Sequence, residues 1–266
     1  MNPTFGFVHP NVRRILGWSR VPLGDFPNEF TTGPSGALTP VSGTLTINTN
    51  GTVVENQERT GNIVVNADNV VIRNCKIIYG PGTAIQSNGL NLLVEDCEID
   101  LQNTIGGTGI ESFNYTARRC DVYGGENLMW AETNVTIEDC YLHDTVPYNP
   151  IDDPHTDGIQ MPTVTENVLI KHNTIYGGYV DEDNFGNSAI TSGDSINVRV
   201  LNNLLAGGGV TLRCPSEVDA DFEWHDNRFS RIFTDTVGGF GPVNDGDLHV
   251  NSGNVYHETG LPVDID

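Results

Sequence analysis

The sequence has few positive charges. Lysine and arginine together number 13 against 35 aspartates and glutamates, which gives a formal net charge of −22. Nucleic acid is therefore not an expected partner, because no basic patch is available to displace counterions from phosphate. The same charge disfavours anionic membranes and strongly acidic polymers. A neutral or cationic partner, or one bridged by a metal ion, suits this surface better.

Long apolar runs are also missing. No stretch of ~18 apolar residues occurs, so no membrane helix is expected. Residues 1–20 show no apolar stretch behind Arg13 and Arg14, so we expect no signal peptide. The five cysteines, an odd number, do not predict a disulfide framework. Hydrophobic residues nevertheless make up 37% of the chain, which excludes a disordered protein.

A short pattern repeats along the chain. It reads Asn-Val-x-Val/Ile-x-x-Cys/Asn-x-Ile/Leu, as in residues 69–77 and 91–99. Inside each copy apolar and polar residues alternate, and turn residues bracket the copy, which is typical of β-strands. The Cys or Asn position recurs at Cys75, Cys97, Cys120, Cys140, Asn173, Asn203 and Asn227, with degenerate copies at Gln57 and Gly253.

A second short strand lies between successive copies, as in residues 82–87 and 107–112. Strands that recur in this way without helices between them favour a coil in which each turn stacks on the last. The predicted fold is all-β, a parallel β-helix of about nine rungs over residues 41–258, followed by a tail at 259–266. Stacking at ~4.8 Å per rung predicts buried ladders of cysteines and of asparagines that bond the rungs above and below.

Residues 1–40 do not match the repeat and are rich in proline, with Trp18, Phe26 and Phe30 interspersed. The end of a β-helix exposes unpaired backbone that something must cover. We expect this arm to be either such a cap or a segment that docks onto another protein.

The order of these elements resembles a family of right-handed parallel β-helix proteins of actinobacteria and their bacteriophages. The matching segments lie between residues 38 and 263 and include the rungs, Tyr141–Asp144, His155–Gln160, Asn202–Gly209 and Gly253–His257. The resemblance implies a single-stranded right-handed β-helix. It also implies a cell-surface protein or a phage minor tail protein, and the expected lack of a signal peptide favours the phage. A tailspike-like homotrimer is left open, since no coiled-coil heptads argue for it.

A candidate sugar site follows from strand periodicity. The isoleucine-like residue of each second strand (Ile85, Ile110, Met129, Ile159, Ile190, Val210) should face inward, so that both of its neighbours face solvent. One side then gives mostly small residues: Ala84, Gly109, Leu128, Gly158, Ala189 and Gly209. The other side gives Gln86, Glu111, Trp130, Gln160, Thr191 and Thr211, with Arg213 beyond them. Amides bond hydroxyls and an indole stacks on a pyranose, so these residues predict glycan binding; an ordinary solvated strand face is the alternative.

Two long acidic insertions precede second strands. One reading makes Asp157 with Glu111 or Glu132 a carboxylate pair for glycoside hydrolysis, with His155 tuning a proton. Another makes the insertions a Ca²⁺ site, with Asp152, Asp153, Asp181 and Asp183 as oxygen ligands, although no cofactor is required. The alternative to both is that these residues bond turn amides or are solvated.

The leading hypothesis is therefore a phage tail-tip protein of the virion, which acts outside the host cell. Its β-helix would bind a host cell-envelope polysaccharide, and residues 1–40 would contact other tail proteins. The alternatives are a glycan depolymerase and a purely structural virion component. A polysaccharide lyase is less favoured than a hydrolase, because the site offers only Arg213 as a cation.

Overall fold

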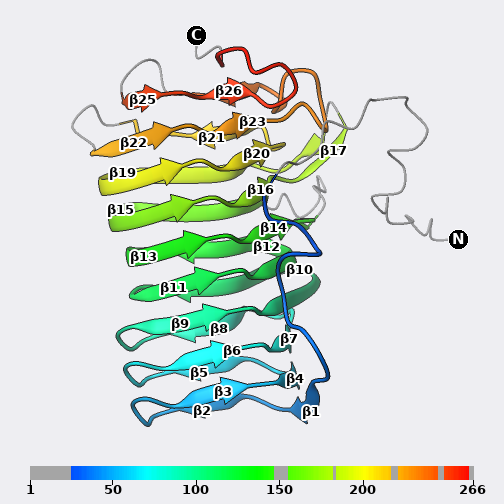
Figure 1. Cartoon of the computed structure of the whole chain (residues 1–266), viewed down its shortest axis with the longest axis vertical. Helices are drawn as coiled ribbons and strands as arrows, with labels where there is room; N and C mark the ends of the chain where they lie inside the picture. Colours follow the sequence, from blue (N-terminus) through cyan, green and yellow to red (C-terminus); the bar gives the residue numbers. More distant parts are fainter. Residues whose placement is uncertain (1–24, 147–154, 182–183, 217–220, 245–248, 264–266) are drawn as a thin grey trace, which may run out of the picture.

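The computed structural model describes residues 25–146, 155–181, 184–216, 221–244 and 249–263. These residues form 26 β-strands and no α-helix. Twenty-four of the strands belong to one sheet, which winds into an elongated coil (Figure 1). Strands of successive turns pair in parallel, for example β3 with β6 and β6 with β9. The predicted parallel β-helix is confirmed.

Each turn of the coil contributes to three faces (Figure 1). The first face holds β1 (Thr39–Ser42), β4 (Gln57–Thr60), β7 (Lys76–Ile78), β14 (Tyr141–His143), β16 (Thr174–Tyr176), β20 (Leu204–Ala206), β23 (Arg228–Phe229) and β26 (Val255–Tyr256). The second face holds β2 (Leu45–Ile47), β5 (Ile63–Val65), β8 (Thr83–Ser87), β21 (Val210–Arg213) and β24 (Gly241–Val243). The third face holds β3 (Val53–Glu55), β6 (Val71–Arg73), β9 (Leu92–Glu95), β11 (Tyr115–Arg118), β13 (Thr133–Glu138), β22 (Phe222–His225) and β25 (Val250–Ser252).

Four long strands pass round a corner and serve two faces. The strands β10 (Glu98–Ser112) and β12 (Asp121–Ala131) run from the first face to the second, and β15 (Asp157–Lys171) and β19 (Ser188–Leu201) from the second to the third. The third face then has nine stacked strands in the described part of the chain, as the repeat predicts. A separate antiparallel hairpin, β17 (Tyr179–Asp181) with β18 (Asn184–Phe185), lies outside the coil.

The corner between the third and first faces is made by one left-handed residue per turn. Asn74 and Asp96 there have φ of 50° and 52°. Asn and Asp tolerate this conformation because their short polar side chains bond locally. The other members of this corner are Asn56, Arg119, Asp139, His172, Asn202 and Asp226.

The residue after each corner points into the core and forms the predicted ladder. Asn173 accepts a hydrogen bond from the Cys140 amide at 2.8 Å and donates one to the Ile137 carbonyl at 2.9 Å. Asn203 repeats both contacts one rung on. The four ladder cysteines and Cys214 are buried and form no disulfide. The stacked amides therefore satisfy groups whose burial would otherwise be costly.

The last member of the ladder differs from the prediction. Asn254, not Gly253, accepts the hydrogen bond from the Asn227 amide, at 3.0 Å. Gly253 occupies the left-handed corner instead, with φ of 69°. The sequence pattern therefore places the ladder position of the last repeat copy one residue too early. The reason is that Gly253 occupies the corner position at which most other turns have Asn or Asp.

The third face carries a ladder of alternating charge. Six outward residues stand in register from the first turn upward: Glu55, Arg73, Glu95, Arg118, Glu138 and Lys171. Arg73 contacts Glu55 at 2.6 Å, and Arg118 contacts Glu138 at 2.6 Å. Parallel stacking places each side chain directly above its counterpart, so without these cations like charges would be neighbours.

A buried arginine lies near the open end of the coil. Arg59 is 6% exposed and stands in register between Val41 and Ile77. Its guanidinium donates to the Gly43 carbonyl at 2.8 Å and to the Gln57 side chain at 3.0 Å. These two hydrogen bonds partly satisfy a charged group whose burial is otherwise costly.

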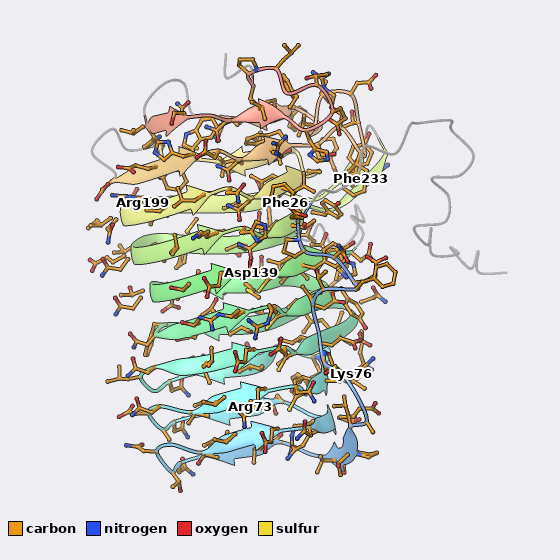
Figure 2. All side chains as sticks on the ribbon, in the orientation of Figure 1. Phe26, Arg73, Lys76, Asp139, Arg199 and Phe233 are labelled. Carbon is orange, nitrogen blue, oxygen red and sulfur yellow. The ribbon has the colours of Figure 1, made fainter. Side chains whose placement is uncertain are left out.

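Residues 25–38, here called the strap, run down the side of the coil to β1 (Figure 1). Phe26 packs 5.5 Å from the His172 ring (Figure 2), and the Ser35 amide donates to Asn74 at 2.7 Å. The Gly33 amide donates to the Arg119 carbonyl at 3.0 Å. This part of the arm covers the corner between the third and first faces and does not cap the first turn. The rest of the arm, residues 1–24, lies outside the described residues.

The charge ladder predicts a register-dependent cost. Arg118→Glu would stack three carboxylates, with Glu95 below and Glu138 above, and should lower the free energy of unfolding by about 1–2 kcal/mol. Arg118→Gln should cost about half as much. Urea unfolding measures both changes. Thr116→Glu is the control, because it changes the net charge by as much as Arg118→Gln does but stands between two uncharged residues, Leu93 and Thr136. Equal losses for Arg118→Glu and Thr116→Glu would contradict the ladder.

Candidate functional site

The residues of the predicted glycan site form one in-register column on the second face. Gln86 pairs with Glu111, Glu111 with Trp130, and Trp130 with Gln160. The register continues from Gln160 to Thr191 and from Thr191 to Arg213. All six side chains are half-buried. We call this set the polar column: Gln86, Glu111, Trp130, Gln160, Thr191 and Arg213.

The upper end of the column differs from the sequence prediction. Leu212, not Val210, pairs with Ile190 and faces inward. Thr211 is consequently buried, with its hydroxyl donating to the Gly207 carbonyl at 2.8 Å. The inward position of this strand therefore lies two residues later than the sequence pattern predicts. Gly207 and Gly208 have positive φ and form an additional turn before the strand, which the alternation of apolar and polar residues does not reveal.

The predicted smooth column of small residues does not face solvent. Ala84, Leu128 and Ala189 have no exposed surface. At Gly109 and Gly158, an added Cβ would collide with backbone and side chains of the next turn. The strand bends here as it leaves the corner, so two successive residues point inward. The second face thus presents a single column instead of a flat surface two residues wide.

Asp157 lies beneath the upper end of the column and has no exposed surface. Thr191 donates to its carboxylate at 2.6 Å, and Asn187 donates at 3.1 Å. Burial raises the pKa of Asp157 to about 6, although these two bonds and the charges of Arg213 and His155 oppose the rise. A buried carboxylate that titrates near neutrality marks a candidate functional site.

Glu111 and Glu132 form a second acidic group lower on the same face. Thr83 donates a hydrogen bond to Glu111. Burial, and then the negative charge of Glu111, raise the pKa of Glu132. The two carboxylates therefore interact electrostatically.

The predicted catalytic residues do not gather in one place. Asp157 stands in register with Asn127, which in turn pairs with Thr108. From Glu111 it is thus three residues along the strand and two rungs up, roughly 10 Å in each direction between Cα atoms. His155 is exposed and lies two residues before Asp157, whose carboxylate it affects electrostatically. The structure brings Glu111 and Glu132 together and leaves Asp157 and His155 as a separate group.

The proposed calcium ligands are not described. Asp152, Asp153 and Asp183 lie outside the described residues, as does the side chain of Asp181. Among the residues that are described, no group of three His, Cys, Asp or Glu side chains is placed to hold a metal ion.

The same part of the chain contains no helix long and apolar enough to cross a membrane.

The first face carries an ionic cluster that the sequence did not predict. His143 contacts Asp121 at 2.9 Å and Asp144 at 2.8 Å, and its ring stacks 4.0 Å from that of Tyr141. Burial lowers the pKa of His143, but the two carboxylates outweigh it and raise the pKa to about 9. Asp144 follows His143 directly in the sequence, but Asp121 could not be recognised as a partner there, because it reaches His143 only through stacking, one turn below.

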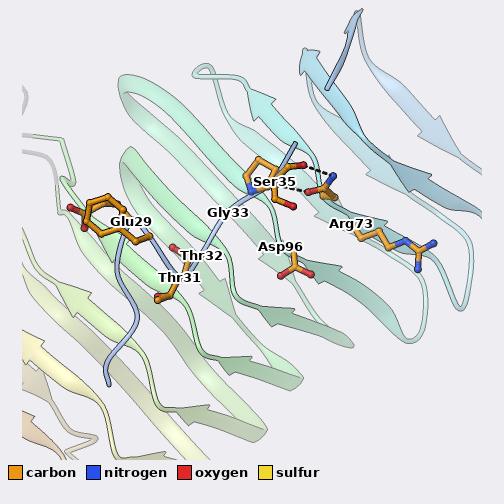
Figure 3. A pocket seen from close by; sticks show the side chains of 10 residues that line it. Glu29, Thr31, Thr32, Gly33, Ser35, Arg73 and Asp96 are labelled. Carbon is orange, nitrogen blue, oxygen red and sulfur yellow. Dashed lines mark hydrogen bonds between the residues drawn. The ribbon is translucent and has the colours of Figure 1, made fainter. Parts of the chain in front are cut away.

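A cavity of about 670 Å³ lies between the strap and the coil (Figure 3). It is lined by Glu29, Phe30, Thr31, Thr32, Gly33, Pro34, Ser35, Arg73, Asn74 and Asp96. Its cation is already paired, Arg73 with Glu55, and Asp96 is paired with Arg119. Asn74 is bonded to Ser35 of the strap. This cavity is consistent with packing of the strap and offers less to a ligand than the polar column does.

A family model described as "Right handed beta helix region" matches residues 38–209, more than half of the chain. Comparisons with curated proteins and with solved structures found no match. The matched span includes the polar column from Gln86 to Thr191.

The raised pKa of Asp157 predicts a pH-dependent stability. The stability that the protonated Asp157 carboxyl contributes is fully present below pH 3.8, which is the pKa of this carboxyl in the unfolded chain. That stability is lost as the pH rises through about 6, the pKa in the folded protein. Asp157→Asn keeps an acceptor for Thr191 and Asn187 without the charge, so it should raise the free energy of unfolding at pH 7 by about 1–3 kcal/mol.

Urea unfolding at several pH values between 4 and 7 measures this effect. The exposed Asp194, changed to Asn, is the control and should leave the pH profile unchanged. A loss of stability in Asp157→Asn at pH 7 would show that the charge is compensated in the fold.

Proposed function

The chain belongs to the right-handed β-helix family, and on that scaffold we propose that the polar column binds a glycan of a host cell envelope. The observation that carries the proposal is the register of the column, in which Trp130 stands between Glu111 and Gln160. Successive side chains are ~4.8 Å apart, a step similar to the length of a sugar ring in an extended chain. A linear polymer can therefore contact one rung after another.

The chemistry of the column supports a sugar ligand. Gln86 and Gln160 each offer an amide donor and acceptor for hydroxyl groups. Trp130 offers an indole, whose apolar face suits the C–H face of a pyranose. The net charge of −22 favours a neutral glycan over a polyuronate.

The proposed biological setting is a bacteriophage tail tip. This part of the proposal rests on the resemblance of Tyr141–Asp144 and His155–Gln160 to phage and actinobacterial β-helix proteins. In that setting the protein is a minor tail component of the virion and meets an actinobacterial envelope outside the cell. Residues 1–40 would contact other tail proteins, and a homotrimer is one assembly that fits.

Retention on isolated actinobacterial cell-wall polysaccharide tests the binding function. Wild type should be retained, and Trp130→Ala should weaken retention about tenfold, because burying roughly 50 Å² of the indole face against a sugar contributes about 1.3 kcal/mol. Leu169→Ala is the matched control, since Leu169 is a half-buried outward residue on the third-face part of β15. Absence of wild-type retention, or equal retention of Trp130→Ala, would refute glycan binding by the column.

A second candidate function is glycoside hydrolysis by the Glu111–Glu132 pair. Glu132 lies one rung above Glu111 and two residues further along the chain, so these two half-buried carboxylates repel each other and the pKa of Glu132 is raised, which favours it. Glu132 would protonate the leaving oxygen, and Glu111 would act as base or nucleophile. Asp157 is too distant to join this pair.

Release of new reducing ends from the same polysaccharide measures this activity. In the hydrolase, Glu132→Gln should lower the rate about 100-fold or more, while Asp194→Asn, which changes an exposed carboxylate outside the polar column, should cleave like wild type. Retention without reducing ends favours the binding function. Neither retention nor cleavage favours a structural virion component.

A further inference from the structure

We propose that the upper end of the polar column holds a terminal subsite for one neutral pyranose unit, with Phe185 and Phe240 as its apolar wall and Asn187, Thr191 and Arg213 as its polar wall. This inference rests on the glycan-binding function above and specifies where the polymer ends. Neither aromatic residue belongs to the polar column.

The apolar wall is a pair of aromatic rings held by glycine. Phe240 is 79% exposed, and its ring meets that of Phe185 edge-on at 5.0 Å. Phe185 comes from the β17–β18 hairpin and lies against Gly209 and Gly239, where an added Cβ would press on its ring. The two glycines thus let Phe185 pack flat on the coil, and Phe185 supports an exposed phenyl group. Such a surface suits the C–H face of a pyranose.

The polar wall is fixed from beneath by Asp157. Asn187 uses its amide nitrogen to bond both Asp157, at 3.1 Å, and Thr191, at 3.2 Å. With the nitrogen turned inward, the carboxamide oxygen is turned away from Asp157 and can accept from a sugar hydroxyl. A preorganised amide loses little freedom on binding.

Arg213 completes the polar wall one rung above Thr191. Its Nε is buried and has no hydrogen-bond partner in the described structure. Because the side chain as a whole is half-buried, the other guanidinium N–H groups of Arg213 are the donors that a ligand oxygen can reach. The charges of Arg213 and Asp157 offset each other near neutral pH, which favours an uncharged sugar.

Backbone contacts place the two walls next to each other. The Gly209 amide donates to the Asn187 carbonyl at 2.9 Å, and the Phe240 amide donates to the Gly209 carbonyl at 2.6 Å. Asn187, Gly209 and Phe240 therefore succeed one another up the coil, with the Phe185 ring over the glycine between them. The span of two rungs, roughly 10 Å, is the size of one sugar unit with its contacts.

The position is terminal because the second face ends here. Phe240 directly precedes β24, the last second-face strand in the described part of the chain. Val210 pairs with Gly241, so Phe240 stands above Gly209, four residues before Arg213 on the strand. The aromatic wall therefore lies beside the upper end of the column, where a polymer that follows the column from Gln86 reaches its last rung. We therefore expect this subsite to recognise a chain end, whereas Trp130 contacts the interior of the polymer.

The test compares two probes: intact actinobacterial cell-wall polysaccharide, and short oligosaccharides released from it by mild acid. Phe240→Ala should lower affinity for the oligosaccharides about tenfold and leave Trp130-dependent retention of the intact polymer within twofold. Leu261→Ala, which removes another apolar side chain that is 63% exposed, should change neither. Thermal unfolding should be unchanged in both variants, because both side chains are exposed.

The outcomes separate this inference from the function on which it rests. Wild type that retains neither probe overturns the glycan-binding function itself. Polymer retention that depends on Trp130, together with oligosaccharide affinity unaffected by Phe240→Ala, overturns the subsite alone. Wild type that retains the polymer but no oligosaccharide also overturns the subsite.

Discussion

Vertical stacking in parallel register governs this molecule. Within the coil, each paired strand residue lies ~4.8 Å above a counterpart in the previous turn, so each paired position in the repeat becomes a ladder. A residue type can recur at one position of the repeat only if two side chains of that type can stack on each other in adjacent turns. Buried Asn does so by bonding the backbone of both adjacent turns, and buried Cys does so as a small apolar group. Glutamate does not, and the third face therefore alternates Glu55, Arg73, Glu95 and Arg118.

This constraint explains where the few basic residues stand in the structure. Arg73 and Arg118 interrupt a stack of carboxylates, and Lys76 bonds Glu98 on the first face at 2.7 Å. Arg59 has a different place: it is buried inside the first turns of the coil, where it bonds the Gly43 carbonyl and the Gln57 side chain. A strongly acidic surface is thus compatible with tight stacking because the few basic residues stand where like charges would otherwise meet.

Register also connects the scaffold to the proposed function. Stacking turns six residues that are about two dozen positions apart into one continuous outward column. The same stacking buries Asp157 beneath that column, where its charge is costly. An ionisable group buried next to a proposed binding surface is a common mark of function. Here the buried charge of Asp157 lowers the stability of the fold, but its carboxylate orients Asn187 and Thr191.

The sequence by itself determined the coil, the core ladder and the composition of the column as far as Thr191. These depend on strand periodicity and repeat spacing, which are local properties. It placed Gly253 and Val210 wrongly because corner glycines add or replace a residue without changing the alternation around them. Only the tertiary structure decided that Ala84 and Ala189 are buried, that Glu111 meets Glu132 and not Asp157, and that Phe185 supports Phe240. Such distances depend on how each corner bends and how loops pack across turns, which residue spacing along the chain does not encode.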